Sequence, residues 1–332
     1  MKKAFLAALT GVVVLAGCAK TEVTEVSDNR AINFSNFVTN SVKSIDNTEA
    51  LTKFYVFGGF QGDDGWTNVF ENEEVTKAGS AWTYDPTRYW TVHTYNFAAY
   101  SNNNTNTGVT AAWIADANKH LSLDFTIQDA KNDDLVYAVA TQGWDGGQTV
   151  PTVDLAFKHI LSKVAFQFSK AADLNGVNLT ITDIKVSANT AGTFTGTDIS
   201  EGQYLIDQWT VSGEKSDVLY NEEVAINAND AAVTVTRVMI PQAITGYTVD
   251  FSVTFNDIDA TGAPAGEPKT LNFSVAIDGT TDQNWKPGYS YVYKAVIDAA
   301  NLDLKPIVFT VDEVGAWEDD TNVDLDIPTG TI

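Results

Sequence analysis

Apolar side chains along the chain either alternate with polar ones or gather in short β-branched and aromatic runs. Period-two alternation predicts a half-buried strand, and a short apolar run between turn residues predicts a strand that is buried on both faces. Segments with one of these patterns cover residues 53–57, 95–100, 120–127, 135–140, 163–168, 177–184, 233–238, 247–255, 271–277, 289–297 and 307–311. The chain shows no long helical period, and we expect only short helical turns, at 47–51 and 111–118.

Turn-forming residues separate these segments. Glycine, asparagine and aspartate cluster at 58–59, 62–65, 102–104 and 259–262. Strands that are spaced this way, with turns between them instead of helices, predict an all-β protein made of antiparallel β-sandwiches. A small, polar, turn-rich stretch at 192–202 lies between two strand-dense halves. The sequence therefore predicts an N-terminal domain at residues 31–200 and a C-terminal domain at residues 201–332.

The start of the chain has the pattern of an export signal. Two lysines follow Met1, residues 4–15 are apolar, and a small pair precedes Cys18, the only cysteine. This pattern predicts a secretory signal peptide at residues 1–17, and its apolar run is shorter than the roughly 20 residues of a membrane-spanning helix. The polar residues 18–30 are expected to form a tether or propeptide.

The residues around the cysteine, Leu-Ala-Gly-Cys at 15–18, resemble a bacterial lipoprotein signal. The resemblance implies that Cys18 is acylated, becomes the first mature residue and anchors the chain to the outer membrane, with palmitate among its acyl chains. The alternative is a plain secreted protein with an unpaired thiol, which is a liability in an exported chain.

Charge and composition narrow the choice of partners. The net charge is −23, and loss of residues 1–17 leaves 18 Lys and Arg side chains against 43 Asp and Glu, a net charge of −25. Such a surface repels phosphate backbones, so we expect no nucleic-acid partner. With 44% hydrophobic and 11% aromatic residues, the chain can build sizeable cores.

Motifs for catalysis are absent from the sequence. There is no HExxH, GxSxG, Walker or GxGxxG motif, and the three histidines, His93, His120 and His159, lie in unrelated segments. We expect no enzyme activity and no cofactor. Calcium could bind the acids at 257–262 or 319–326 through their oxygens, but Ile258 and Thr261 break the EF-hand pattern, so solvated hairpin acids are favoured and no metal is expected.

Tryptophans are the remaining candidates for ligand binding. Trp66, Trp82, Trp90, Trp113 and Trp144 could serve as platforms on which sugar rings stack. A β-sandwich core uses such residues as well, and the core role is favoured for each of them taken singly.

Five segments together carry a resemblance to a known family. Residues 95–100, 157–168, 239–242, 285–293 and 314–317 resemble the fimbrillin family of Bacteroidales lipoproteins, which includes the stalk, tip and anchor subunits of type V pili. The resemblance implies two tandem transthyretin-like β-sandwich domains and export as a lipoprotein. It also implies assembly by strand exchange after an Arg-specific protease removes the N-terminal segment.

Strand exchange requires a strand that leaves a groove and another strand of matching alternation that fills it. Residues 31–38 place Ile32 and Phe34 on one face and are the candidate displaced strand, whose departure opens the groove. Residues 322–328 are the candidate donor strand; residues 322–327 alternate without exception, with apolar side chains at Val323, Leu325 and Ile327. Burying these three side chains would contribute about 5–9 kcal/mol before ordering costs. Alternatively, residues 322–328 form an ordinary last strand whose acids protect a sheet edge.

The processing site has two candidates. Arg30 is the only arginine before Arg88 and lies in a polar stretch, which suits cleavage of the Arg30–Ala31 bond. Lys43, followed by Ser44, is a competing basic site in a second loop-like segment. Cleavage at Arg30 would leave Ile32 and Phe34 on the subunit.

Two functional hypotheses follow. The first is a structural pilus subunit at the cell surface, whose partners are homologous stalk, tip and anchor subunits, a processing protease and the outer membrane. The second is a tip adhesin or a monomeric surface lipoprotein that binds a host protein or glycan.

Overall fold

The computed structural model describes residues 30–36, 51–197, 206–221, 223–226, 232–258, 264–277, 283–303 and 305–315. Over these residues the chain is almost entirely β-structure, which confirms the predicted all-β class. Its helices within this part are two 3-10 turns, η1 (Ala172–Leu174) and η2 (Ile206–Gln208), and one short helix, α1 (Ala299–Leu302). No helix in the described ranges is long and apolar enough to cross a membrane.

A six-stranded antiparallel sheet is the scaffold of the N-terminal half. Across the sheet, its strands are β10 (Lys158–His159), β8 (Leu135–Gly143), β5 (Thr94–Asn102), β2 (Lys53–Gly62), β3 (Gly65–Ala78) and β4 (Ala81–Thr83). Alternate residues of β2 enter two different hydrophobic cores, Phe54 one core and Tyr55 the other. β2 is buried on both faces, which is why its residues 54–57 form a continuous apolar run in the sequence.

A seven-stranded sheet runs along the molecule. It consists of β18 (Pro264–Ala276), β17 (Thr248–Ile258), β12 (Val177–Thr195), β7 (His120–Thr126) and β6 (Val109–Ile114), and β13 (Trp209–Tyr220) and β14 (Val224–Ile226) also pair with β12. The 19-residue β12 pairs with β17 in its first half and with β7 near its end. One strand therefore joins β7 from the N-terminal half of the sequence to β17 from the C-terminal half.

The expected helical turn at 111–118 is wrong. Residues 109–114 form strand β6, which pairs with β7 in an antiparallel hairpin. The hairpin pairs the backbone of these residues with β7, so a helical turn is not needed to satisfy it.

A four-stranded sheet packs against the seven-stranded one. Its strands are β15 (Val233–Met239), β11 (Ser162–Lys170), β20 (Tyr289–Ile297) and β21 (Thr310–Gly315), and a separate two-stranded pair consists of β16 (Gln242–Ala243) and β19 (Asn284–Trp285). The largest hydrophobic core lies between the two sheets and includes Phe166, Phe251, Tyr293 and Phe309. The rings of Phe166 and Tyr293 stack at 5.4 Å between centroids.

The core that Tyr55 of β2 enters lies between the six-stranded sheet and the end of the seven-stranded sheet. There the Trp209 indole donates to the carbonyl of Ile160 at 2.8 Å, and the Tyr137 hydroxyl donates to the carbonyl of Gly196 at 3.3 Å. A Cβ atom on Gly196 would lie 2.3 Å from the Tyr137 ring, so this close approach requires glycine.

Within the predicted boundary region 192–202, residues 192–195 are the last residues of β12. The domain boundary near residue 200 stays a prediction.

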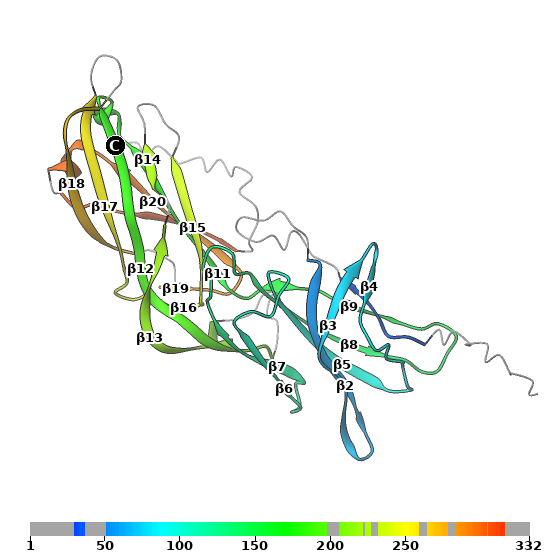
Figure 1. Ribbon diagram of the computed structural model, residues 1–332. Helices are drawn as coiled ribbons and strands as arrows, with labels where there is room; N and C mark the ends of the chain where they lie inside the picture. Colours follow the sequence, from blue (N-terminus) through cyan, green and yellow to red (C-terminus); the bar gives the residue numbers. More distant parts are fainter. Residues whose placement is uncertain are drawn as a thin grey trace, which may run out of the picture.

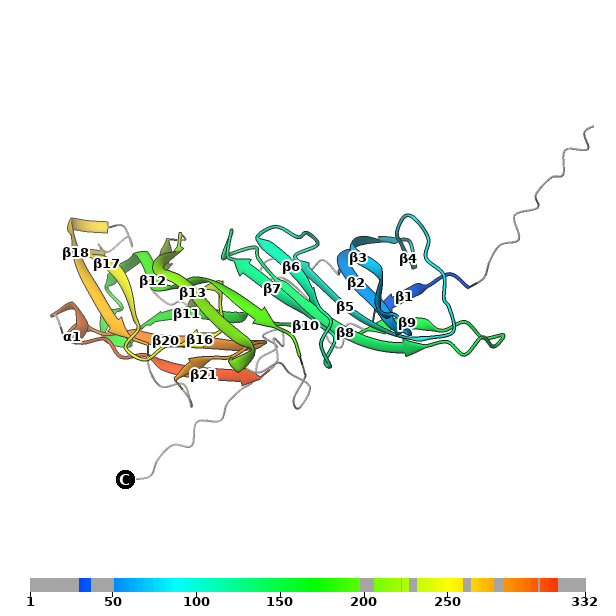
Figure 2. The ribbon, with the colours of Figure 1, turned by 90° about the horizontal axis from the view of Figure 1, so that it is seen from below.

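Figures 1 and 2 show the resulting elongated arrangement. Strands β2 to β5 and β8 lie toward one end, together with β9 (Thr152–Leu155) and β1 (Asn33–Asn36). Strands β17 and β18 lie toward the other end. The first described residues of the chain, which form β1, are therefore at the end that is farthest from β17 and β18.

Candidate functional site

The candidate site is the position of β1, a four-residue strand held between two segments that are distant in sequence. On one side β1 pairs in parallel with β9, with Phe34 opposite Val153. On its other side the Ile32 amide donates to the carbonyl of Arg88 at 2.9 Å, and the Trp90 amide donates to the carbonyl of Arg30 at 2.9 Å. The backbone is therefore paired with β9 along β1 and with residues 88–90 just before β1, at Arg30 and Ile32.

The side chains of β1 follow the alternation expected from the sequence. Ile32 is 0% exposed and Phe34 is 5% exposed, whereas Asn33 between them is exposed. The Phe34 ring meets four other rings edge-on, those of Phe54, Phe70, Tyr84 and Phe97, at centroid distances of 5.8, 5.4, 5.8 and 5.9 Å. Removal of β1 would leave an apolar groove lined by these aromatic side chains.

Burial and ring contacts set the strength with which β1 is held. Burying one side chain of this size contributes about 1.5–3 kcal/mol, and each aromatic pair adds about 0.5–1.5 kcal/mol. Phe34 in β1 and Ile32 just before it account for most of this, because they are the buried side chains of residues 30–35. The strand is thus firmly held by two side chains and few backbone pairs.

Tyr84 closes the groove on the side away from β9, a role that the sequence did not reveal. Its hydroxyl donates to the carbonyl of Ile32 at 2.7 Å, and burial raises its pKa, which keeps the hydroxyl protonated as a donor. Arg88 fixes the same segment, because its guanidinium donates to the carbonyls of Val69 and Pro86 and pairs with Glu73 at 3.3 Å. In the sequence, the only sign of these roles is that the aromatic residues Trp82 and Tyr84 occupy alternate positions. This alternation does not show which segment they contact.

Of the two candidate processing sites, the structure describes Arg30–Ala31 but not Lys43–Ser44. Arg30 is exposed, but its carbonyl accepts a hydrogen bond from Trp90, and Ala31 forms a β-bridge with Tyr89. The Arg30–Ala31 bond therefore lies inside paired backbone. Lys43 and Ser44 lie outside the described residues, as do Cys18 and the candidate donor residues Val323, Leu325 and Ile327.

Comparison with known proteins identifies the family. No curated protein matches the chain. The sequence profile of the fimbrillin-like family matches residues 39–313, which is most of the chain. The chain belongs to the fimbrillin-like family. Strand β1 precedes the matched range of this fimbrillin-like protein, whereas the groove segments β2, β5, β9 and residues 82–90 lie within it.

Solved structures resemble this fimbrillin-like protein over most of its length. A fimbrial protein from Bacteroides vulgatus aligns with a TM-score of 0.53 at 13% identity, covering 86% of this chain and 99% of the other. A candidate cell adhesion protein from Bacteroides uniformis (TM-score 0.49, 18% identity) covers 86% and 99%, and the fimbrial anchor protein Mfa2 from Porphyromonas gingivalis (TM-score 0.39, 10% identity) covers 86% and 97%. The Bacteroides vulgatus protein therefore shares the fold.

The tryptophans of this fimbrillin-like protein divide into buried and accessible ones. Trp82 and Trp90 are buried in the core around Phe34. Trp66 and Trp113 are half-buried and stack on each other at 5.2 Å. Trp144 is half-buried and lines an open pocket. Of the five candidates for a sugar platform, Trp144 is the one that the described cavities place in a pocket.

The histidines and acids do not converge on a catalytic or metal site within the described ranges. His159 lies 2.7 Å from Asp134, His120 lies 3.5 Å from Asp116, and His93 stacks on Phe60 at 4.0 Å, in three separate places. Among the residues that the structure describes, no group of three His, Cys, Asp or Glu side chains is arranged to hold a metal ion.

Proposed function

We propose that this protein is a structural subunit of a surface fimbria in which β1 is a placeholder strand. In this proposal β1 leaves its groove, and the alternating C-terminal strand of a neighbouring subunit takes its place. The observation that carries the proposal is the insertion of residues 30–36, which include β1, between β9 and residues 88–90, with Ile32 and Phe34 buried. Membership in the fimbrillin-like family and the shared fold support it.

The groove has requirements that the C-terminal segment meets. Loss of β1 would expose four aromatic side chains and unpair backbone groups on both sides, and both changes are costly. An incoming strand must therefore present apolar side chains at every second position, and its backbone N–H and C=O groups must be available to pair with the edges of the groove. Val323, Leu325 and Ile327 have that spacing, so the donor would restore what β1 supplied.

Processing after β1 is required for this exchange. A cut at Arg30–Ala31 leaves β1 attached to β2 through residues 37–52, whereas a cut at Lys43–Ser44 detaches it. We therefore favour Lys43, which requires a protease that accepts lysine. Before processing, the chain would be exported with its signal peptide, acylated at Cys18 and held at the outer membrane.

Mass spectrometry of the N-terminus of protein taken from the cell surface tests this proposal. Polymerised chains that begin at Ser44 are the expected result, because they have lost β1. Polymers composed only of chains that begin at acylated Cys18 or at Ala31 would contradict it, since β1 would still be present. Chains that are solely monomeric would favour the second candidate, a tip adhesin or a monomeric binding lipoprotein, for which the open pocket at Trp144 is the specific observation.

A further inference from the structure

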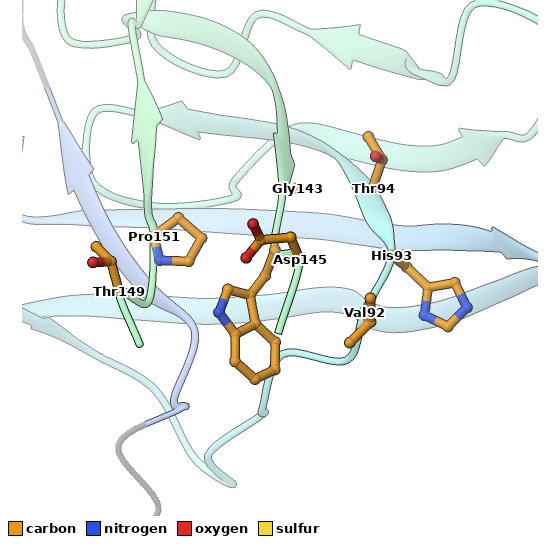
Figure 3. Close-up of a pocket in the computed structure, with 8 residues that line it drawn as sticks. Val92, His93, Thr94, Gly143, Asp145, Thr149 and Pro151 are labelled. Carbon is orange, nitrogen blue, oxygen red and sulfur yellow. The ribbon is translucent and has the colours of Figure 1, made fainter. Parts of the chain in front are cut away.

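An open pocket lies where β5 begins and β8 ends, and the structural role proposed above does not use it. Its lining residues are Val92, His93, Thr94, Gly143, Trp144, Asp145, Thr149 and Pro151. The cavity of 560 Å³ falls in the range of small-molecule sites, about 300–1,000 Å³. Figure 3 shows Asp145 between Pro151 on one side and His93 on the other. Side chains from two loops thus surround one opening.

The aromatic wall of the pocket is fixed without any ligand. The Trp144 amide donates to the carbonyl of His93 at 3.2 Å, and its indole N–H donates to the carbonyl of Gly147 at 3.2 Å. The indole also packs against the core around Phe34. Because the ring is already oriented, a ligand that stacks on it pays little ordering entropy.

Polar groups with spare hydrogen-bonding capacity line the pocket, Asp145 next to Trp144 in the chain and His93 beyond Val92, with its ring turned away from Asp145 (Figure 3). Asp145 accepts the Gly147 amide with Oδ1 at 2.9 Å, and its Oδ2 has no partner among the described residues. The His93 ring stacks on Phe60, and its Nδ1 bonds to the Thr91 hydroxyl at 2.8 Å. Its Nε2 makes no hydrogen bond within the described ranges. The pocket therefore offers a carboxylate oxygen and an imidazole nitrogen from side chains whose positions are fixed.

Charge restricts the ligand class. No lysine or arginine lines the pocket, Asp145 carries its only carboxylate, and the whole chain is strongly acidic. Anionic sugars would be repelled. A sugar ring has an apolar face of C–H groups and a rim of hydroxyls, which matches an indole face beside hydrogen-bonding groups. A small cation could also bind to the indole and the carboxylate, but it would make no hydrogen bond to His93, Thr94 or Thr149.

We propose that this pocket binds a neutral oligosaccharide, with one sugar ring on the Trp144 indole and bonded to Asp145, and a further sugar unit of the same chain bonded to His93. The site goes beyond the proposed fimbrial role, since assembly through the β1 groove does not require it. It would give the subunit an adhesive contact with a glycan.

Isothermal titration and saturation-transfer NMR of the purified protein test the proposal. The probes are neutral oligosaccharides of glucose, mannose, galactose and N-acetylglucosamine, with a glucuronate oligomer as the anionic probe and tetramethylammonium as the cationic probe. At least one neutral oligosaccharide should bind with a Kd in the millimolar range or below, and the glucuronate oligomer should not. If no neutral oligosaccharide binds, or if tetramethylammonium alone binds, the proposal is wrong.

Variants locate the binding in this pocket. Asp145→Asn keeps the Oδ1 acceptor for Gly147 and should weaken binding about tenfold. Trp144→Phe keeps an aromatic ring in the half-buried position and should weaken binding several-fold, with unfolding measured in parallel. Asp64→Asn, at an exposed carboxylate in the turn between β2 and β3, is the matched control and should leave the Kd unchanged. Equal Kd values for Asp145→Asn and the unmodified protein would overturn the assignment.

Discussion

Two parallel strand pairs, β1 with β9 and β11 with β20, occur in the described part of an otherwise antiparallel protein. The β1–β9 pair has four residue pairs, and the β11–β20 pair has eight. Each of β1 and β20 buries large side chains in a core, but β20 is also flanked by β21 in antiparallel register. The difference lies in how each strand is connected to the rest of the chain.

β20 is part of a continuous path through α1 to β21, so its departure would dismantle the largest core. β1 is connected along the chain to β2 through residues 37–52 on its C-terminal side. Its contribution is concentrated in Ile32 and Phe34. A strand can therefore be essential to a core and still be exchangeable, provided that its contacts are few, strong and repeatable by another segment. The following predictions test that difference.

The largest effect is expected for Leu325→Asp, which would place a charge in the apolar groove of the neighbouring subunit. Such burial costs several kcal/mol, so polymerisation should fail. The melting temperature of the monomer should hardly change, because in the proposed assembly the strand packs on a neighbour and not on its own domain. The measurements are thermal unfolding of purified monomer and a ladder assay for SDS-resistant polymers.

Asp324→Asn is the control for this variant, since the alternation of the sequence predicts its side chain on the opposite face of the proposed strand. It should polymerise normally. A less stable monomer with normal polymers for Leu325→Asp would assign residues 322–328 to their own domain and reject the donor role.

Truncation of one large side chain in each strand should separate the two regions. Tyr293→Ala in β20 and Phe34→Ala in β1 should each lower the free energy of unfolding of the unprocessed protein by about 3–5 kcal/mol. Tyr293→Ala also removes the acceptor of the Trp285 indole N–H. After processing, only Tyr293→Ala should still weaken the polymers, because the polymers no longer contain β1.

Denaturant unfolding of the precursor and dissociation of assembled polymers measure the two effects. Val296→Ala, at an exposed position of β20, and Asn33→Ala, at an exposed position of β1, are the matched controls. Polymers destabilised by Phe34→Ala would mean that β1 remains in its groove.

The sequence predicted local patterns well and long-range partners poorly. The alternation at 31–38 placed Ile32 and Phe34 on one face, as the structure has them, because side-chain direction in a strand depends only on position. The partners of β1, namely β9 and residues 88–90, lie more than 50 residues away in the chain. Local patterning contains no information about such pairings.

Strands with exposed surfaces also escaped the sequence analysis. β3 and β13 carry mostly exposed, polar side chains, so neither has a hydrophobic period, and each forms because a neighbouring strand offers its edge. The tryptophans were equivalent in sequence. Tertiary packing distinguishes Trp90, which is fully buried, from Trp144, which lines a pocket.

A smaller effect is expected for Tyr84→Phe, which removes the hydroxyl that bonds the carbonyl of Ile32. One such bond contributes about 0.5–1.5 kcal/mol. The wall of the groove is the same for β1 and for a donor strand, so both the precursor and the polymer should be destabilised. Chemical unfolding and polymer dissociation measure the two losses. If the polymer were unaffected, the donor would not run along Tyr84 as β1 does.

The smallest effect concerns Asp154, which lies opposite Ser35 in the β1–β9 pair and accepts a hydrogen bond from the Ser35 hydroxyl. If the donor enters with Leu325 in the place of Phe34, Asp326 takes the place of Ser35. Two carboxylates would then face each other, which is unfavourable by about 0.2–1 kcal/mol. Asp154→Asn should therefore raise the temperature at which SDS-resistant polymers dissociate.

The salt dependence and a double variant test whether the higher dissociation temperature comes from removing a repulsion between Asp154 and Asp326. The gain from Asp154→Asn should be larger at low ionic strength, because exposed charges are screened by salt. Asp326→Asn should produce a similar gain, and the two substitutions together should add little, since either one alone removes the repulsion. The unprocessed protein is the control, as an asparagine at position 154 can still accept the Ser35 hydroxyl and its stability should be nearly unchanged. Fully additive gains would show that Asp154 and Asp326 do not meet, and the donor would then enter the groove in a register different from that of β1.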